Sequence, residues 1–288
     1  MSPDSNDPTH SIQPPPALMD AELQPLLTDP FVRAWAQAPR DGAPALRQRL
    51  LDRLAATRAA EAGMVTVRRQ QAARETLAPG VQAQWLYRAA DGQPRRPGEP
   101  LRVRLLELAP GATLPAAALA AHGPCHREWL LLQGQVRSPD QGLELTLRDY
   151  HVCPTGTAWP SWHSAQGALL FLRESDLGPE DGDAPRTVRD QQAGWPDYAP
   201  GIQRRVLWQR QGQAALLYFA QPGASVPVHN HGHDEECLMV QGELFLDDLL
   251  LQAGDYQLAP AGSGHRITAT DTGVVIYAHG DLDLKFTS

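Results

Sequence analysis

Three histidines and one carboxylate stand at spacings that could bring them around a single metal ion. His229 and His231 are two residues apart, and Glu235 follows soon after them. His265 comes later, directly after a Pro-Ala-Gly-Ser-Gly segment. Neutral imidazoles with a carboxylate suit zinc, iron, manganese, nickel or copper better than calcium or magnesium. The pattern therefore predicts a transition-metal site with coordination positions left open for water, a ligand or dioxygen.

Short strands would have to present these side chains. Residues two apart on a strand point to the same face, so His229 and His231 can converge. Residues 232–234 have turn composition, and a second strand is predicted over 235–240. If that strand folds back antiparallel, Glu235 faces the histidines, and Cys237 and Met239 share its face and line the pocket. Further strands are predicted over 249–251, 255–259 and 266–270, the last opened by His265.

Other residues compete for these roles. His233 is the nearest alternative ligand, although the turn is expected to direct it outward, and Glu236 is the alternative to Glu235. Candidate pocket residues are Tyr218, Met239, Tyr256 and His233. The simplest non-functional explanation is a histidine-rich surface loop, or histidines whose hydrogen bonds are satisfied in a core.

The two segments resemble the two motifs of the cupin superfamily. Residues 223–242 read GASVPVHNHGHDEECLMVQG and residues 254–265 read GDYQLAPAGSGH. The family patterns are G-x5-H-x-H-x3-E-x6-G and G-x5-P-x-G-x2-H-x3-N, and only the final Asn departs, being Ala269 here. The resemblance implies a small antiparallel β-barrel with a metal near its mouth. It implies His229, His231, Glu235 and His265 as ligands, and its spacing favours Glu235 over Glu236.

The chain also repeats itself. Residues 66–87 align with residues 187–208 without a gap, and Asp149-Tyr150 recurs as Asp255-Tyr256. This predicts a mainly β fold of two tandem cupin (double-stranded β-helix, jelly-roll) barrels after a short helical N-terminal segment. The predicted boundaries are a disordered segment 1–18, a helical segment 19–62, a degenerate cupin 64–175, a linker 176–186 and a metal-binding cupin 187–288.

The first repeat, residues 64–175, lacks the counterparts of the predicted metal ligands. Arg127 aligns with Glu235, and Trp159 aligns with His265, so one metal per chain is expected. A rebuilt metal site is the alternative, from His122, His126, His151, His163 and Glu128. Otherwise this unit is structural or binds a ligand without metal, and Trp129, Trp159 and Trp162 line an apolar pocket or pack in its core.

The flanking segments resemble one cupin family more narrowly. The Thr-Val-Arg strand, residues 195–202 and residues 206–208 are similar to ChrR-like cupins. That family includes the C-terminal domain of ChrR-type anti-sigma factors and relatives of the 2,4'-dihydroxyacetophenone dioxygenases. A short helix is predicted after Asp29-Pro30 and a longer one over 43–62. Within the longer one, residues 44–51 resemble the segment that joins an anti-sigma domain to its cupin. The His-x3-Cys-x2-Cys zinc motif of such proteins is absent from residues 1–62.

Three functions compete on this evidence. The first is a regulatory or sensor protein that binds a sigma factor through its N-terminal helices. The second is a non-haem iron dioxygenase acting on a small oxygenated aromatic substrate. The third is a binding or storage module with structural zinc. The metal is one divalent ion, zinc, iron, manganese or nickel, and a small-molecule ligand is possible in each case.

Composition indicates where the protein is located and which classes of partner it binds. A formal net charge of −8 argues against broad nucleic-acid binding, which needs a basic face. Three scattered cysteines suggest no disulfide framework, and neither a signal peptide nor a membrane-spanning run is visible. We therefore expect a cytoplasmic monomer or homodimer without direct nucleic-acid or membrane contact.

Overall fold

The computed structural model describes residues 46–49, 51–52, 55, 63–90 and 95–286, and the chain divides into two compact units. The first unit, Met1–Ala56, is helical at its described residues, where Leu46 and Leu51 are exposed. The predicted disordered segment 1–18 and the helix expected after Asp29-Pro30 lie outside the described residues. No helix among the described residues is long and apolar enough to span a membrane.

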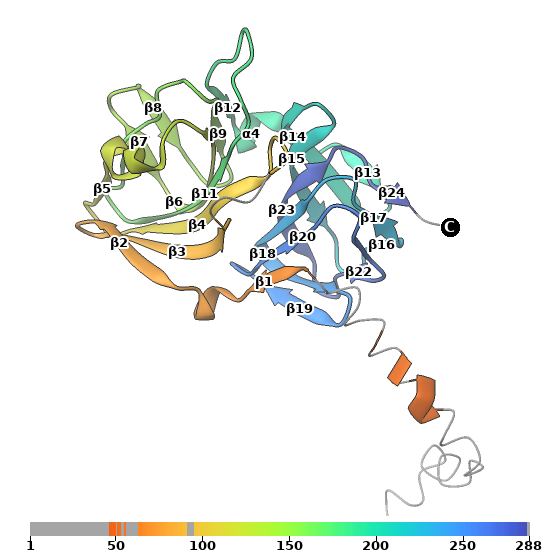
Figure 1. Ribbon diagram of the computed structural model, residues 1–288. Helices are drawn as coiled ribbons and strands as arrows, with labels where there is room; N and C mark the ends of the chain where they lie inside the picture. Colours follow the sequence, from red (N-terminus) through yellow and green to blue (C-terminus); the bar gives the residue numbers. More distant parts are fainter. Residues whose placement is uncertain (1–45, 50, 53–54, 56–62, 91–94, 287–288) are drawn as a thin grey trace, which may run out of the picture. The chain divides into compact units, whose positions relative to one another are not determined.

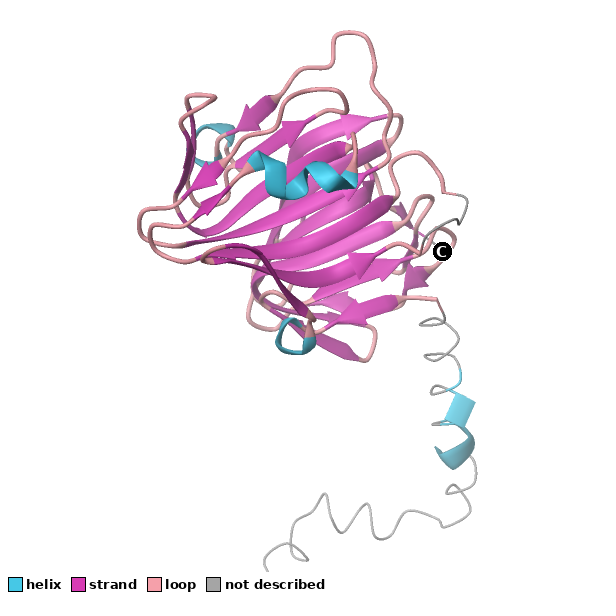
Figure 2. Ribbon diagram, turned by 60° about the vertical axis from the view of Figure 1, so that its left-hand side comes forward, coloured by secondary structure: helices cyan, strands magenta, loops and turns pink. Residues whose placement is uncertain are grey.

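The second unit, Thr57–Ser288, consists mainly of strands (Figure 2), and its sheets form two β-barrels. The first barrel combines a seven-stranded sheet, ordered β12-β9-β6-β11-β4-β3-β2, with a four-stranded sheet, ordered β5-β10-β7-β8. Its strands are β2 (Arg74–Ala78), β3 (Val81–Arg88), β4 (Pro100–Leu108), β5 (Thr113–Leu114), β6 (His126–Gly134), β7 (Val136–Ser138), β8 (Leu143–Leu145), β9 (Tyr150–Cys153), β10 (Trp162–His163), β11 (Ala168–Ser175) and β12 (Arg186–Val188).

The second barrel has a ten-stranded sheet whose main path is β1-β20-β18-β23-β15-β14-β13, and a three-stranded sheet ordered β21-β17-β24. Its strands are β1 (Val65–Val67), β13 (Asp197–Ala199), β14 (Ile202–Arg210), β15 (Gln213–Ala220), β16 (Ser225–Val226), β17 (His229–Asn230), β18 (Glu235–Leu246), β19 (Leu249–Gln252), β20 (Tyr256–Ala259), β21 (Gly264–His265), β22 (Thr268–Ala269), β23 (Val274–Asp281) and β24 (Lys285–Phe286). Among the described residues of this unit, the strands are connected by three short helices: η2 (Arg69–Gln71), η3 (Ala116–His122) and α4 (Asp190–Ala193).

Central strands are apolar on both faces because each face packs on a different core. In β11, Leu170 and Leu172 pack inside the first barrel, whereas Leu169 and Phe171 pack between the barrels. A strand buried on both sides reads as a continuous hydrophobic run, as the Ala-Leu-Leu-Phe-Leu sequence of β11 does. The interface core draws on both barrels, so the two form one packed unit.

The strand that opens each repeat joins the sheet of the opposite barrel. β1, from the start of the first repeat, pairs antiparallel with β20 of the second barrel. β12, from the start of the second repeat, pairs antiparallel with β9 of the first barrel. Figure 1 shows the orange β1 among the blue strands of the second barrel. The Thr-Val-Arg repeat is therefore a reciprocal strand exchange.

A matching pair of arginines fastens the exchanged strands. Arg68 donates to Asp255 at 2.7 Å, and Arg189 donates to Asp149 at 2.9 Å. The same aspartates also accept backbone N–H groups, from Arg69 and Asp190, at 2.9 Å and 2.8 Å. The repeated Asp-Tyr dipeptides thus serve the exchange, with each aspartate binding the strand that arrives from the other barrel.

The predicted fold class is confirmed, with two tandem β-barrels following a short segment that is helical at its described residues. The division into 64–175, 176–186 and 187–288 stays a prediction. The exchange means that the strand opening each repeat is hydrogen-bonded to the opposite barrel.

Candidate metal centre

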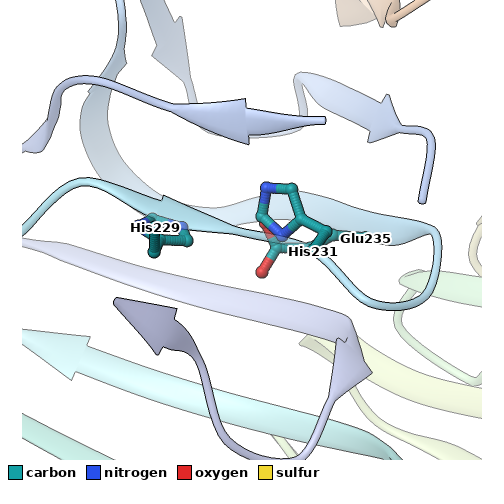
Figure 3. A group of neighbouring side chains, drawn as sticks. All are labelled: His229, His231 and Glu235. Atoms are coloured by element: carbon teal, nitrogen blue, oxygen red, sulfur yellow. The ribbon is translucent and has the colours of Figure 1, made fainter. Parts of the chain in front are cut away.

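The three histidines gather around one point in the second barrel. Ring centroids are 5.2 Å apart for His229 and His231, 5.2 Å for His231 and His265, and 5.9 Å for His229 and His265. Glu235 joins them, because its Oε2 atom lies 3.1 Å from Nδ1 of His231. Donor atoms of His229, His231 and Glu235 all lie within 4.8 Å of one another (Figure 3). These three residues could hold one ion, and His265 lies beside them.

Cross-strand pairing places His229 beside His265. β17 and β21 are antiparallel, with His229 opposite His265 and Asn230 opposite Gly264. Directly opposed residues of an antiparallel pair present their side chains on the same face. A Cβ on Gly264 would lie 2.3 Å from the backbone oxygen of His229. Glycine is therefore what lets the strand carrying His265 approach this closely.

His231 lies just beyond β17, in the loop that leads to β18. Its backbone N–H donates to the carbonyl of Ser263 at 2.9 Å, and its own carbonyl accepts from the N–H of Gly262 at 2.8 Å. Asp234 adds a third link, accepting the N–H of Ala261 at 2.8 Å. The loop that carries His231 is thus fastened to the loop that delivers His265.

Glu235 reaches the histidines across the barrel and not from a hairpin. Among the described strands, β18 pairs with β19, β20, β22 and β23, whereas β17 pairs with β21 and β24. The expectation that 235–240 folds back on the histidine strand is wrong, although Glu235 still meets His231. Cys237 lines the cavity beside the site, while Met239 packs in the barrel core.

The alternative ligands have other partners. Glu236 faces the interface between the barrels, where it accepts from Arg173 at 2.7 Å and from the hydroxyl of Tyr256 at 2.8 Å. His233 places its Nδ1 atom 2.5 Å from Asp281. Of the candidate pocket residues, Tyr218 lines the cavity, whereas Tyr256 and His233 are directed elsewhere.

Burial sets the protonation of the site before an ion binds. It lowers the pKa of His231 to about 3, with His265 and His229 adding to the effect, and it lowers the pKa of His229 as well. Burial raises the pKa of Glu235 to about 7. The Nε2 atoms of His231 and His265 are buried and have no hydrogen-bond partner among the described residues. Because a buried polar atom without a partner is costly, this donor set fits a metal ion.

An apolar cavity opens beside the cluster. It encloses about 630 Å³ between its atoms, open solvent included. His229, Glu235 and His265 form one part of its wall. Its larger apolar lining residues are Ile202, Val226, Leu244, Leu246, Ile276 and Leu284, and its hydroxyl groups come from Tyr198, Tyr218, Ser225, Thr268 and Thr270. No arginine or lysine is among the described residues that line it. Tyr198, Ile202, Ile276 and Leu284 lie outside the two motifs and not next to them in sequence, so the motifs alone could not identify this part of the lining.

In the first barrel, the position that corresponds to Glu235 holds an arginine, and this arginine forms a buried ion pair. Arg127, the counterpart of Glu235, donates to Glu174 at 2.8 Å, and Arg104 donates to the same carboxylate at 2.7 Å. The guanidinium of Arg127 lies 3.6 Å above the ring of Trp159, the counterpart of His265. A fixed positive charge would repel a cation at this position.

The first-barrel histidines whose side chains the structure describes, His126, His151 and His163, contact different partners, and the side chain of His122 lies outside that set. His151 contacts Thr187 at 2.9 Å, and His163 contacts Thr113 at 3.1 Å. The ring of His126 packs at a tilt against that of Trp208 at the interface, with a centroid separation of 4.9 Å. Within the described residues, no second group of three potential ligands gathers as closely as His229, His231 and Glu235. The expectation of one metal per chain stays a prediction.

The second barrel is similar to a known family of domains. Residues 183–283 match the model of the ChrR cupin-like domain. None of the curated proteins matches this sequence. The family match covers the four predicted ligands and the exchanged strand β12, so the chain contains a cupin domain.

Solved structures share the fold at low sequence identity. A proposed dioxygenase of Nostoc punctiforme has a TM-score of 0.54 at 15% identity, over 72% of this chain and 75% of that one. A proposed glyoxylate-induced protein of Pseudomonas aeruginosa has a TM-score of 0.55 at 13% identity, over 77% and 87%. The oxalate decarboxylase of Bacillus subtilis, an enzyme with Mn(II) centres, has a TM-score of 0.52 at 15% identity, over 75% and 77%. The tandem cupin architecture is thereby confirmed.

Proposed function

We propose that this protein is a metal-binding bicupin of the ChrR-like group that works as a cytoplasmic regulator or sensor. His229, His231, Glu235 and His265 bind one divalent transition metal per chain. The observation that carries the proposal is the set of converging, unpartnered imidazole nitrogens beside Glu235, within the segment that matches the ChrR cupin-like domain. Zinc, iron, manganese and nickel all suit this donor set.

Elemental analysis of the untagged protein tests the metal assignment. We expect close to one metal atom per chain, and almost none after His229→Ala with His231→Ala. The matched control is His163→Ala, which removes a first-barrel histidine whose ring contacts the hydroxyl of Thr113. Full metal content in the double variant would contradict the assignment.

The regulatory role is supported by the helical lead-in. Leu46 and Leu51 are 49% and 47% exposed on the described part of that helix, so both side chains are accessible to a partner. We propose a sigma factor as the partner, with no direct binding to nucleic acid or membrane. Capture of a host sigma factor by the full chain, lost after Leu46→Asp with Leu51→Asp, would support this role. Failure to capture any sigma factor would contradict it.

A second function, a non-haem iron dioxygenase, is favoured by the cavity. Its wall joins Glu235 and two histidines to an apolar interior without arginine or lysine. Such a pocket suits a neutral, largely apolar substrate with a carbonyl or hydroxyl group. It disfavours a dicarboxylate, because the described lining holds no arginine or lysine to pair with a carboxylate that the metal does not bind. Bound iron would supply Lewis-acid and redox chemistry. The chain's own residues would hold the substrate and exclude water.

Oxygen uptake distinguishes the two functions. The iron-loaded protein is assayed with hydroxylated aromatic ketones, and the His229→Ala/His231→Ala variant is the control. Uptake confined to the intact site would favour the enzyme. No uptake by a fully iron-loaded protein across a wide substrate panel would contradict the dioxygenase and leave the regulatory proposal in place.

A further inference from the structure

We infer that Asp247 is a positioning residue of the metal centre, which holds the imidazole of His265 with its Nε2 atom free for the ion. The inference rests on the proposed metal function. Asp247 belongs to no part of the two motifs. It lies in the turn between β18 and β19, and its side chain extends to the strand region that carries His265.

The carboxylate of Asp247 has two tasks. Its Oδ2 atom lies 3.2 Å from Nδ1 of His265. Its Oδ1 atom accepts the backbone N–H groups of Arg266 at 2.8 Å and Ile267 at 3.2 Å. Asp247 and His265 are 4% and 2% exposed. One carboxylate thus fixes both the ring of His265 and the backbone just after it.

His265 has more need of such support than the other ligands. It lies outside the group of three whose donor atoms fall within 4.8 Å of one another. Its Nδ1 atom faces Asp247, so the unpartnered Nε2 atom is the one left for an ion. Ring orientation therefore decides whether His265 becomes a fourth ligand.

The three histidines differ in the group that contacts the Nδ1 atom of the ring. Nδ1 of His229 contacts the neutral carbonyl of Pro227 at 2.9 Å, and Nδ1 of His231 faces Glu235, itself a predicted ligand. Among the contacts of the described residues, the Nδ1 atom of His265 faces a carboxylate that is not a predicted ligand, whereas those of His229 and His231 face Pro227 and Glu235. A carboxylate that accepts from the distal nitrogen fixes the tautomer and raises the basicity of a metal-bound imidazole. Arg266 Nε, 3.5 Å from Asp247, moderates this charge.

Metal affinity tests the inference. Wild type and Asp247→Asn are loaded with Zn²⁺, and affinity is measured by competition with a chelator. Loss of such a carboxylate lowers metal affinity roughly 10–100-fold in comparable sites, and we expect that range here. Asp255→Asn is the matched control, because Asp255 is a buried aspartate of the same barrel that accepts backbone N–H groups and binds Arg68.

The outcomes are distinct. If wild type binds no Zn²⁺, the proposed function fails. If wild type binds Zn²⁺ and Asp247→Asn binds it within about twofold, the positioning role is overturned. A purely structural role would lower the thermal midpoint of the metal-free variant as much as Asp255→Asn does, and lower metal affinity no more than that control.

A second measurement needs no variant. Nitrogen-15 NMR of the Zn²⁺-loaded wild type reports which ring nitrogen of His265 carries the proton. We expect the proton on Nδ1 and the metal on Nε2. A proton on Nε2 would overturn the inference even if Asp247→Asn failed to fold.

Discussion

Arg173 of the first barrel and Glu236 of the second form an ion pair, with 2.7 Å between Nε and Oε1. Both side chains are 1% exposed, and Glu236 directly follows Glu235. Arg173 also donates to Glu128 at 2.9 Å and to the carbonyl of Gly98 at 2.6 Å. The barrel without the metal motif is therefore bonded to the strand that carries Glu235.

Arg173→Met should destabilise the protein strongly. Removing one partner of a buried pair leaves the others uncompensated, and such losses cost about 3–5 kcal/mol. Chemical denaturation measures the change in unfolding free energy. Arg137→Met is the control, because its pair with Glu144 is 65% and 45% exposed and should contribute no more than about 1 kcal/mol. Equal effects from both substitutions would contradict the prediction.

Acid should destabilise the fold through His126. In the folded protein, burial lowers the pKa of His126 from 6.5 to about 4. As the pH falls below 6.5, the unfolded chain takes up a proton that the folded chain does not bind, so stability present at neutral pH is progressively lost. For this one residue the loss is about 2 kcal/mol near pH 5.

Urea denaturation at neutral and mildly acidic pH checks this effect. The variant His126→Gln should lose less stability on acidification than wild type does. Burial also lowers the pKa of His279, to about 3, and of His151, to about 4, so part of the wild-type sensitivity should persist. An unchanged pH dependence in His126→Gln would refute the assignment.

The two halves should not fold alone. Residues 183–288 without the preceding chain lack β1, and they expose interface residues such as Leu238 and Tyr277. We expect this fragment to be unfolded or aggregated and without stoichiometric metal, as circular dichroism, gel filtration and elemental analysis would show. Co-expression with residues 1–182 should give a folded complex with one copy of each. A folded monomeric fragment with full metal would contradict this expectation.

Gly264→Ala should weaken the site and the fold together. The added Cβ would lie 2.3 Å from the backbone oxygen of His229, so β17 and β21 would have to separate. We expect lower metal content and a lower thermal midpoint. Gly178→Ala is the matched control, since nothing lies within 4 Å of the corresponding Cβ. Equal thermal midpoints for the two variants would count against a close-approach role for Gly264.

Local spacing predicted the cluster better than it predicted the strand pairing. His229 and His265 could be placed because each follows directly from a short motif. The pairing partner of β18 could not, because it depends on how distant strands close the barrel. The roles of Tyr256 and Glu236 were also missed, since their shared network is completed by Arg173, a residue remote in sequence.

The repeat was visible in the sequence, but its meaning was not. Thr66 and Thr187 are identical because both lie on strands that cross to the other barrel, where they contact Gln257 at 3.0 Å and His151 at 2.9 Å. Sequence identity between repeats shows that two segments do the same thing. It does not show whether each acts in its own barrel or in its neighbour.

The strand exchange has a consequence for how such a chain can diverge. A duplicated domain that has lost its own ligands is usually free to shrink or disappear. Here deletion of the first half would remove β1 from the sheet of the surviving half, together with the Arg68 contact to Asp255. Loss of the first half would therefore disturb the barrel that carries the predicted metal ligands, and substitutions in β1 would act on a sheet of the opposite barrel.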